Sequence, residues 1–377
     1  MNFSRTEEQQ LLADALARFV QKEYAFEKRR AIEKSAAGFS RDVWAQLAEL
    51  GVLGLTVPEA QGGFGGSPVD TMVVMQALGG GLVVEPYLAT AVLGVAAIAR
   101  AGSDAQKEEF LPGVVAGETI LAFAHEEAQA RGVFAQVETR ARRDGRGFVL
   151  SGRKSVVLHG AQADQLIVSA RTSGGAADAQ GVSLFVLPSK TPGVTLRDYR
   201  TIDGLRAAEL TLADVRVGAE ALLGEVDTAL PVIEQVTDLG TAALCAEAVG
   251  VMEALHAQTL EYLKTRQQFG QPIGRFQVLQ HRAVDMMIHC EQSKSIAMLA
   301  AMKAASDDAH ERRRAVSAAK VHIGRSGRAV AQTAVQLHGG MGLSIELAAA
   351  HYAKRLTMID FWLGDADTHL DRFIANG

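Results

Sequence analysis

Residues 266–274 read Arg-Gln-Gln-Phe-Gly-Gln-Pro-Ile-Gly, and residues 336–342 read Gln-Leu-His-Gly-Gly-Met-Gly. Both segments combine glycines with side chains that donate hydrogen bonds. Taken separately, each reads as a helix stop, because glycine readily adopts the left-handed conformation in which helices end. The two segments start 70 residues apart (336 minus 266). The structure that they indicate depends on the sequence around them.

Long helical windows surround both segments. Residues 229–264, 276–307 and 311–338 contain few helix breakers, and the second window carries an apolar stripe typical of a packed helix. The sequence therefore predicts a C-terminal helical bundle domain over residues 227–377.

The central part of the chain has a different pattern. From about Thr119 the period changes to two, in short runs rich in β-branched residues: 119–124, 134–141, 147–150, 165–170, 182–187 and 210–217. Turn signals such as Asp144-Gly145 separate these runs. The pattern is typical of an antiparallel sandwich or barrel rather than of βαβ units. We predict a middle β domain over residues 119–226.

Residues 1–118 again predict helices. Ser4 and Ser103 each begin a capping-box pattern ahead of an apolar run. The glycines at 79–81 are predicted to form a loop between helices. The N-terminal part is therefore predicted to be a helical domain.

The composition narrows the class of protein. The chain has 377 residues, and its 38 lysines and arginines against 43 aspartates and glutamates argue against a general nucleic-acid binder. Two cysteines, Cys245 and Cys290, exclude a disulfide framework and favour a reducing compartment. The start lacks a signal-peptide pattern, and the apolar-rich run 87–99 is too short to span a bilayer. We expect a cytoplasmic protein with no membrane span.

Several generic sites are not predicted. The chain has no Walker-type phosphate loop and no G-x-G-x-x-G after a strand. His281 and His289 lie eight residues apart, a spacing that does not bring them together as metal ligands. We predict no metal site.

Together, the two glycine segments resemble the acyl-CoA dehydrogenase family, whose pattern includes an R-x-x-F-G-x-x-I-x-x-F-Q turn and a Q-x-x-G-G-x-G helix end. Val57-Pro58-Glu59 before Gly62-Gly63 resembles the P-E-x-x-G-G loop of that family. The resemblance covers essentially the whole chain. It implies an α+β multidomain fold with an N-terminal helical domain, a middle antiparallel β-barrel and a C-terminal four-helix bundle.

The resemblance also implies an activity. Members use FAD to convert an acyl-CoA thioester to the trans-2-enoyl-CoA, as in fatty-acid β-oxidation, and pass the electrons to an electron-transferring flavoprotein. A carboxylate removes the α-proton while hydride leaves the β-carbon for the flavin. FAD lies extended between subunits, so the resemblance implies a homo-oligomer, such as a tetramer, or a hetero-oligomer.

Carried over by motif position, the resemblance implies a set of FAD contacts. Arg266 would pair with the pyrophosphate of a neighbouring subunit's FAD, where a guanidinium fork suits two phosphate oxygens. Glycines would allow close approach of the backbone. The other implied contacts are Gln268, Phe269 and Gln277 near the turn, and Gln336, Gly339 and Gly340 at the helix end.

The catalytic base is where the sequence departs from the family. Many members carry a glutamate in a Y-E-G-T segment, and alignment on Arg372 puts Asp365 in its place. We predict Asp365 as the base. Other members place the base on the first long helix of the bundle, where this chain has Gly240, with Asp238 and Glu247 nearby. These two carboxylates remain alternatives, as does the absence of a competent base.

Other segments depart as well. The usual T-E-P-x-x-G-S-D corresponds to residues 125–132, which lack the proline and the serine, and the usual W-x-T-N-G corresponds to residues 156–160. The ending Leu363-Gly-Asp-Ala-Asp-Thr-His369 resembles small subunits of two-component acyl-CoA dehydrogenases, including a pimeloyl-CoA type. The alternative function is therefore a catalytically incomplete partner subunit, in a heterotetramer with a large acyl-CoA dehydrogenase subunit.

Overall fold

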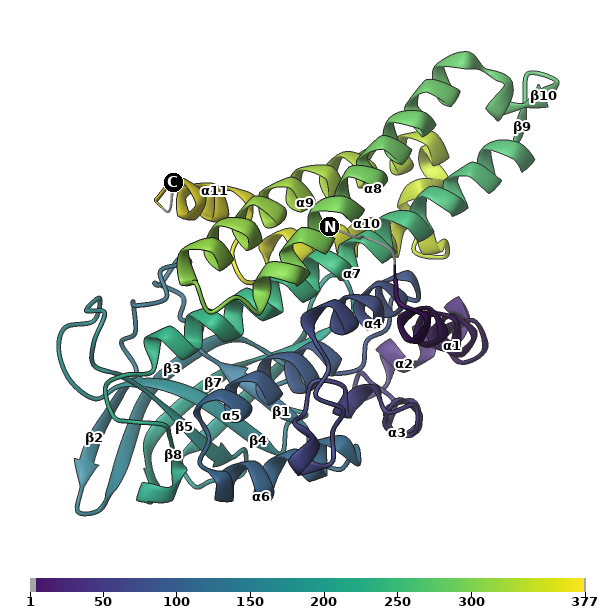
Figure 1. The fold of residues 1–377 in the computed structure, drawn as a ribbon. Coiled ribbons are helices and arrows are strands. Elements are labelled where there is room, and N and C mark those ends of the chain that lie inside the picture. Colours follow the sequence, from purple (N-terminus) through teal and green to yellow (C-terminus); the bar gives the residue numbers. More distant parts are fainter. Residues whose placement is uncertain (1–4, 376–377) are drawn as a thin grey trace. The chain divides into compact units, whose positions relative to one another are not determined.

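The computed structural model describes residues 5–375 of the chain (Figure 1). The chain divides into two compact units. The first unit comprises Met1–Ala31, Pro68–Val83 and Thr241–Gly377, and the second comprises Ile32–Ser67 and Val84–Gly240.

The first unit is helical, and most of it is the C-terminal bundle. Helix α9 packs against α8, α10 and α11. The bundle helices are α7 (Leu230–Thr265, which begins in the second unit), α8 (Gln277–Ala304), α9 (Ala309–His338), α10 (Ala348–Phe361) and α11 (Ala366–Ala375). The first three agree closely with the predicted helical windows.

Helices α1 (Glu7–Glu23) and α4 (Pro68–Gly80) complete this unit, together with most of α2 (Phe26–Lys34). Helix α4 crosses α7 at very close range. A Cβ added to Gly250 would lie 1.9 Å from the backbone oxygen of Gln76, and one on Gly79 would lie 2.3 Å from that of Glu247. The predicted loop at 79–81 is therefore wrong for Gly79 and Gly80, which lie in α4. At Gly79, only glycine permits this close crossing.

The capping predictions differ in outcome. Helix α1 is capped by a box formed by Thr6 and Gln9. The predicted cap at Ser4 lies outside the described residues. The box predicted at Ser103 is confirmed, because its side chain accepts the N–H of Gln106 at the start of α6 (Asp104–Val115).

The second unit contains an eight-stranded sheet in the order β6-β7-β3-β2-β4-β5-β8, with β1 paired to β4. Its strands are β1 (Leu121–Ala124), β2 (Arg140–Asp144), β3 (Gly147–Leu158), β4 (Gln165–Arg171), β5 (Val182–Pro188), β6 (Val194–Arg200), β7 (Arg206–Val217) and β8 (Leu222–Leu223). The β1–β4 and β2–β4 pairs are parallel and the others antiparallel. Helices α3 (Arg41–Glu49), α5 (Val95–Ala101) and α6 belong to the same unit.

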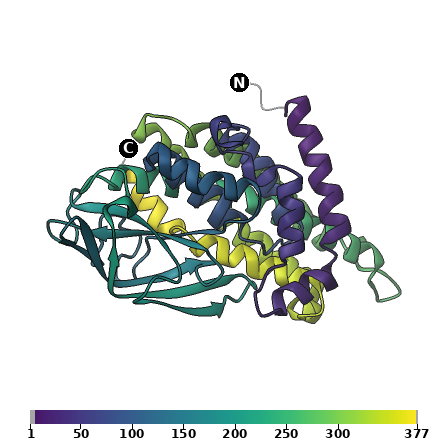
Figure 2. The ribbon, with the colours of Figure 1, turned by 90° about the horizontal axis from the view of Figure 1, so that it is seen from below.

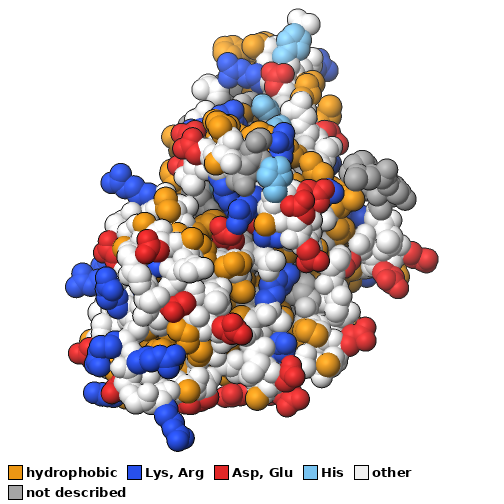
Figure 3. All heavy atoms as spheres, turned by 60° about the vertical axis from the view of Figure 1, so that its left-hand side comes forward, with side chains coloured by type: hydrophobic (Ala, Val, Ile, Leu, Met, Phe, Trp, Pro, Cys, Tyr) orange, Lys and Arg blue, Asp and Glu red, His pale blue; other side chains and the backbone are white. Residues whose placement is uncertain are grey.

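The helical first and last parts and the middle sheet confirm the predicted fold class. Several details of the sheet differ from the prediction: two strand pairs are parallel, β3 extends to Leu158 and β8 was not predicted. The run predicted at 134–141 is strand only from Arg140, and β6, with its mostly polar sequence, was not predicted. No helix within residues 5–375 is long and apolar enough to cross a bilayer. Acidic and basic side chains are mixed over the face drawn in Figure 3.

Candidate functional site

The predicted cofactor turn is a small hairpin that follows α7. Its strands β9 (Gln267–Gln268) and β10 (Gln271–Pro272) pair around Phe269 and Gly270, whose φ angles are 54° and 77°. Two positive φ angles are typical of the two-residue type I′ turn. Positive φ is uncommon for an aromatic residue, and Phe269 is 89% exposed. Such strain often marks a binding site, and in Figures 1 and 2 this hairpin extends past the helix ends.

Arg266 lies at the base of the hairpin and is exposed. Its backbone N–H donates to the oxygen of Tyr262 at 2.8 Å, and its oxygen accepts the N–H of Ile273 at 2.9 Å. These bonds hold the backbone that carries the guanidinium. Gln268 in β9 and Gln277 at the start of α8 are also exposed. The turn thus presents a cation and two amides to its surroundings.

The second glycine segment lies at the end of α9. Gly339 has φ 60° and ψ −144°, a conformation that is essentially restricted to glycine. A Cβ on Gly340 would meet no atom within 4 Å in the described part of the chain, and its φ is not in the left-handed range. Packing inside this chain therefore does not require glycine at 340. Gln336, in the last turn of α9, is exposed beside it.

The structure brings the two glycine segments to the same end of the bundle. Tyr262, in the last turn of α7, stacks on His338, the last residue of α9, with ring centroids 4.4 Å apart and planes 27° apart. The Tyr262 hydroxyl donates to the backbone oxygen of His338 at 3.4 Å. Sequence reasoning missed both residues. The available signal was their position, because Tyr262 lies just before the first motif and His338 lies inside the second.

Asp365 lies in the turn between α10 and α11, in the same unit but away from the hairpin (Figure 1). Its Oδ1 accepts the backbone N–H of Thr368 at 2.8 Å, which caps α11. Hydrogen bonds from the Thr368 backbone, and then from its hydroxyl, hold the pKa of Asp365 below its ordinary value. A general base for carbon acids works best with a raised pKa in an apolar pocket. The surroundings of Asp365 therefore favour a role as helix cap over a role as base.

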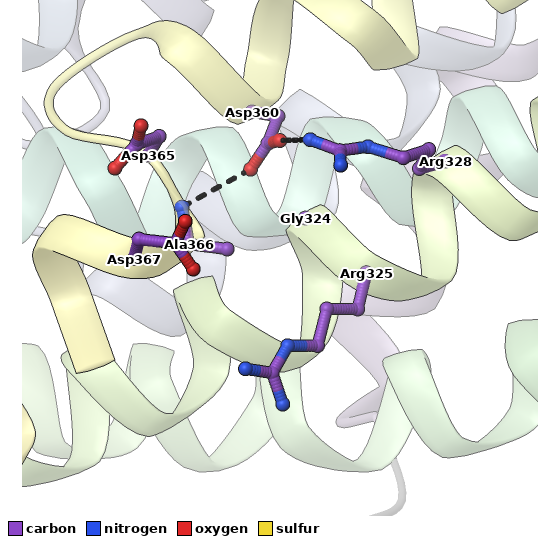
Figure 4. Close-up of a pocket in the computed structure, with 7 residues that line it drawn as sticks. All are labelled: Gly324, Arg325, Arg328, Asp360, Asp365, Ala366 and Asp367. Carbon is purple, nitrogen blue, oxygen red and sulfur yellow. Dashed lines mark hydrogen bonds and ion pairs between the residues drawn. The ribbon is translucent and has the colours of Figure 1, made fainter.

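The cavity beside Asp365 is small and charged. It has a volume of about 90 Å³ and is lined by three aspartates and two arginines among its seven residues (Figure 4). Asp360 accepts from Arg328 at 2.8 Å and from the N–H of Ala366 at 3.2 Å, while Arg325 points away from it. Ligand pockets are typically several times larger and mostly apolar.

Buried side chains hold this turn firmly. The Lys320 ammonium donates to the backbone oxygens of Ile359, Asp360 and Trp362 at 2.6, 3.0 and 2.6 Å. Burial lowers the pKa of Lys320 to about 8. His369 bonds through Nε2 to the Leu363 oxygen at 2.9 Å. The turn is thus fixed in one conformation.

The alternative bases, Glu247 and Asp238, are both buried. Both oxygens of Glu247 accept from the Arg355 guanidinium, at 2.6 and 2.7 Å, and both side chains are buried. One guanidinium thus engages both carboxylate oxygens of Glu247 in a bidentate ion pair. Asp238 is fully buried in α7.

The β domain has an unusual ion pair where the sequence departs from the family. Glu127, at the place of the missing proline, contacts the fully buried Lys154 at 2.6 Å. Burial would raise the pKa of Glu127, but Lys154 and the N–H of Glu138 bring it to about 2. Nearby, Val156 has φ 55° and is 41% exposed. A β-branched residue with positive φ is strained, which singles out this segment as a functional candidate.

Comparisons with known proteins agree with the fold. Models of the acyl-CoA dehydrogenase N-terminal, middle and C-terminal domains match residues 6–118, 122–215 and 230–376. The chain is 30% identical to acyl-CoA dehydrogenase FadE27 of Mycobacterium tuberculosis, over 99% of this chain and 97% of that protein.

Two solved structures extend this similarity. The first is a chain of the ChsE4-ChsE5 complex from Mycobacterium tuberculosis, with a TM-score of 0.90, 30% identity and coverage of 100% of this chain and 98% of that one. The second is butyryl-CoA dehydrogenase from Megasphaera elsdenii, with a TM-score of 0.88, 28% identity and coverage of 100% and 99%. The chain therefore belongs to the acyl-CoA dehydrogenase family.

Proposed function

We propose that the protein is an FAD-dependent acyl-CoA dehydrogenase that works as an oligomer. The family consists of flavin-dependent oxidoreductases that act on the CH–CH bond of acyl-CoA thioesters. For this chain, the reaction would be conversion of an acyl-CoA to the trans-2-enoyl-CoA in the cytoplasm, with an electron-transferring flavoprotein as acceptor. The observation that carries the proposal is the placement of the Arg266 hairpin and the open Gly339–Gly340 turn at one end of the helical unit.

The side chains at this surface fit a dinucleotide. Arg266 offers a fork of donors to a pyrophosphate, and Gly340 leaves the backbone open to close approach. The amides of Gln268, Gln277 and Gln336 would add hydrogen bonds, and Phe269 would pack beside the dinucleotide. When bound, FAD would accept the hydride from the substrate. The task of these residues is to bind and orient it.

The position of the hairpin supports an oligomeric site. The hairpin lies away from Asp365, the predicted base, so the two would serve different cofactor molecules. Apolar side chains are exposed beside the two turns, with Val278 61% and Leu343 73% exposed. Clustered exposed apolar residues are typical of interfaces. This supports a cofactor shared with a neighbouring subunit.

Two substitutions test the cofactor site. We expect Arg266→Gln and Gly340→Val each to weaken FAD binding about 10-fold or more, a change of at least ~1.4 kcal/mol. The first removes a charge-assisted contact to the pyrophosphate, and the second places a side chain where the backbone would approach the cofactor. FAD titration of the cofactor-free protein measures this, with Arg142→Gln, an exposed arginine of β2, as control. Unchanged affinity in both variants would place FAD elsewhere, and a wild-type protein that binds no FAD would refute the proposal.

A second candidate has specific support. Asp365 caps α11 and its pKa is lowered, and the Glu247 carboxylate is held by Arg355. These contacts favour a catalytically incomplete subunit whose partner, a large acyl-CoA dehydrogenase subunit, supplies the base. The similar structure of a ChsE4-ChsE5 complex adds to this support.

Activity measurements separate the two candidates. If Asp365 is the base, the chain alone turns over acyl-CoA, and Asp365→Asn abolishes turnover. If the chain is a partner subunit, turnover requires co-expression with a large subunit, and Asp365→Asn leaves it unchanged. Full activity of the homo-oligomer would exclude the second candidate.

A further inference from the structure

We infer that Tyr262 and His338 are positioning residues for the cofactor, because their stacked rings fix the Arg266 hairpin relative to the Gly339–Gly340 turn. This inference rests on the proposed function and adds two residues to its site. Neither residue is among the predicted FAD contacts.

Each ring is directly connected to one of the two turns. The backbone oxygen of Tyr262 accepts the N–H of Arg266 at 2.8 Å, so a shift of Tyr262 moves the residue that carries the guanidinium. His338 immediately precedes Gly339, whose N–H still bonds to the Gln336 oxygen in α9. The 4.4 Å stack therefore links two backbones that belong to different helices.

The histidine ring is itself held in place. His338 is 6% exposed, and its Nδ1 lies 2.9 Å from the Ala334 oxygen. A carbonyl only accepts, so Nδ1 carries the proton and donates it. The Tyr262 hydroxyl also donates to the backbone oxygen of His338. A fixed histidine gives the tyrosine a fixed surface on which to stack.

The hairpin has limited support of its own, namely the β9–β10 pairing and an edge-to-face contact of Phe269 with Phe276, whose ring centroids lie 6.0 Å apart. Every residue from Arg266 to Gly270 is exposed, so its direction is set at its base, where Tyr262 lies. A ligand that touches both turns binds tightly only if the turns are held at the correct separation beforehand. Loss of the stack would therefore reduce affinity without removing any group that touches the cofactor.

The test compares loss of the ring with its replacement. Tyr262→Leu and His338→Leu remove the stack, and we expect each to weaken FAD binding about 10-fold, from the typical strength of an aromatic pair. Tyr262→Phe and His338→Phe retain an aromatic pair and should restore affinity to within about 2-fold. ADP, which reports the adenosine-pyrophosphate half alone, should show the same pattern. His256→Leu, on α7 but bonded to the α8 backbone, is the control and should bind normally.

A measurement on the wild-type protein covers the case in which the leucine variants do not fold. We expect FAD to slow hydrogen exchange in residues 263–276 and 336–345 together. Protection of one segment alone would overturn the inference, as would leucine variants with wild-type affinity. If the wild-type protein binds neither FAD nor ADP, the proposed function fails as well. If it binds both and the leucine variants match it, only the positioning role fails.

Discussion

Asp365 shows how the surroundings of a carboxylate determine its chemistry. Alignment on Arg372 places it where the family has a base, but in the structure its Oδ1 accepts the backbone N–H of Thr368. A capping carboxylate is stabilised as an anion by the N–H groups and dipole of the helix. A sequence pattern gives the position of such a residue but not the hydrogen bond that lowers its pKa.

The capping role predicts a stability effect. We expect Asp365→Ala to lower the free energy of unfolding by about 1 kcal/mol, and Asp365→Asn by clearly less, because asparagine caps helices about as well as aspartate. Urea unfolding measures both. Equal stability of wild type and the alanine variant would show that the cap contributes nothing.

Two glycines should differ strongly in how much stability they lose on the same substitution. Gly250→Ala places a methyl group 1.9 Å from a backbone oxygen of α4, so we expect a loss of about 1–3 kcal/mol or more. Gly340→Ala meets no atom within 4 Å in the described chain and should change the stability of the cofactor-free protein by less than about 0.5 kcal/mol. Denaturant unfolding compares the two. A large loss at Gly340 would indicate a structural role instead.

At the level of elements, the turn between α10 and α11 predicts a pH dependence. Burial lowers the pKa of His369 from 6.5 to about 3. Between these values the unfolded chain binds a proton that the native chain does not, so stability is complete above pH 6.5 and falls as the pH drops. The slope for one such group is at most ~1.4 kcal/mol per pH unit.

His369→Gln tests this dependence. The variant should lose stability more slowly than the wild type between pH 6.5 and pH 4, measured as unfolding free energy at several pH values. Both the wild type and the variant contain other acid-sensitive groups, such as His125, whose pKa is also lowered to about 3 by burial. The informative quantity is the difference between the two slopes, and parallel curves would contradict the assignment.

The elements that could be predicted from sequence are those whose pattern is local. Helices α7, α8 and α9 have long windows without breakers, so their limits were close to correct. Strand β6 was missed because it is an edge strand with alternating half-buried and exposed residues and little apolar signal. The helical Gly79 was misread as a loop residue because the reason for its glycine is a contact with α7, far away in sequence.

In the candidate site, too, only the parts with a local sequence pattern could be predicted. The Arg266 and Gly339–Gly340 segments were found because each has a compact motif. The Tyr262–His338 stack was missed because it joins residues 76 apart (338 minus 262), with no local pattern. The Glu127–Lys154 pair was missed for the same reason.

At the scale of the whole molecule, the exposed face of α8 predicts association. Val278, Val284, Met287 and Ile288 are 61, 49, 46 and 45% exposed, which is unusual for a bundle helix in isolation. We expect a dimer or tetramer of the 40.1 kDa chain, measured by light scattering. Val284→Lys with Ile288→Lys should weaken association, whereas Arg142→Gln should not. A monomer at micromolar concentration would contradict this, unless a large subunit restores assembly.

The central claim is that this chain works with FAD on acyl-CoA thioesters. The most direct measurement is the absorbance spectrum of the purified protein, alone and assembled with a large subunit, titrated without oxygen with CoA thioesters of varied chain length. We predict a flavin spectrum whose main visible band is bleached by at least one thioester. A protein that carries FAD in both preparations and is bleached by none of them would contradict the account.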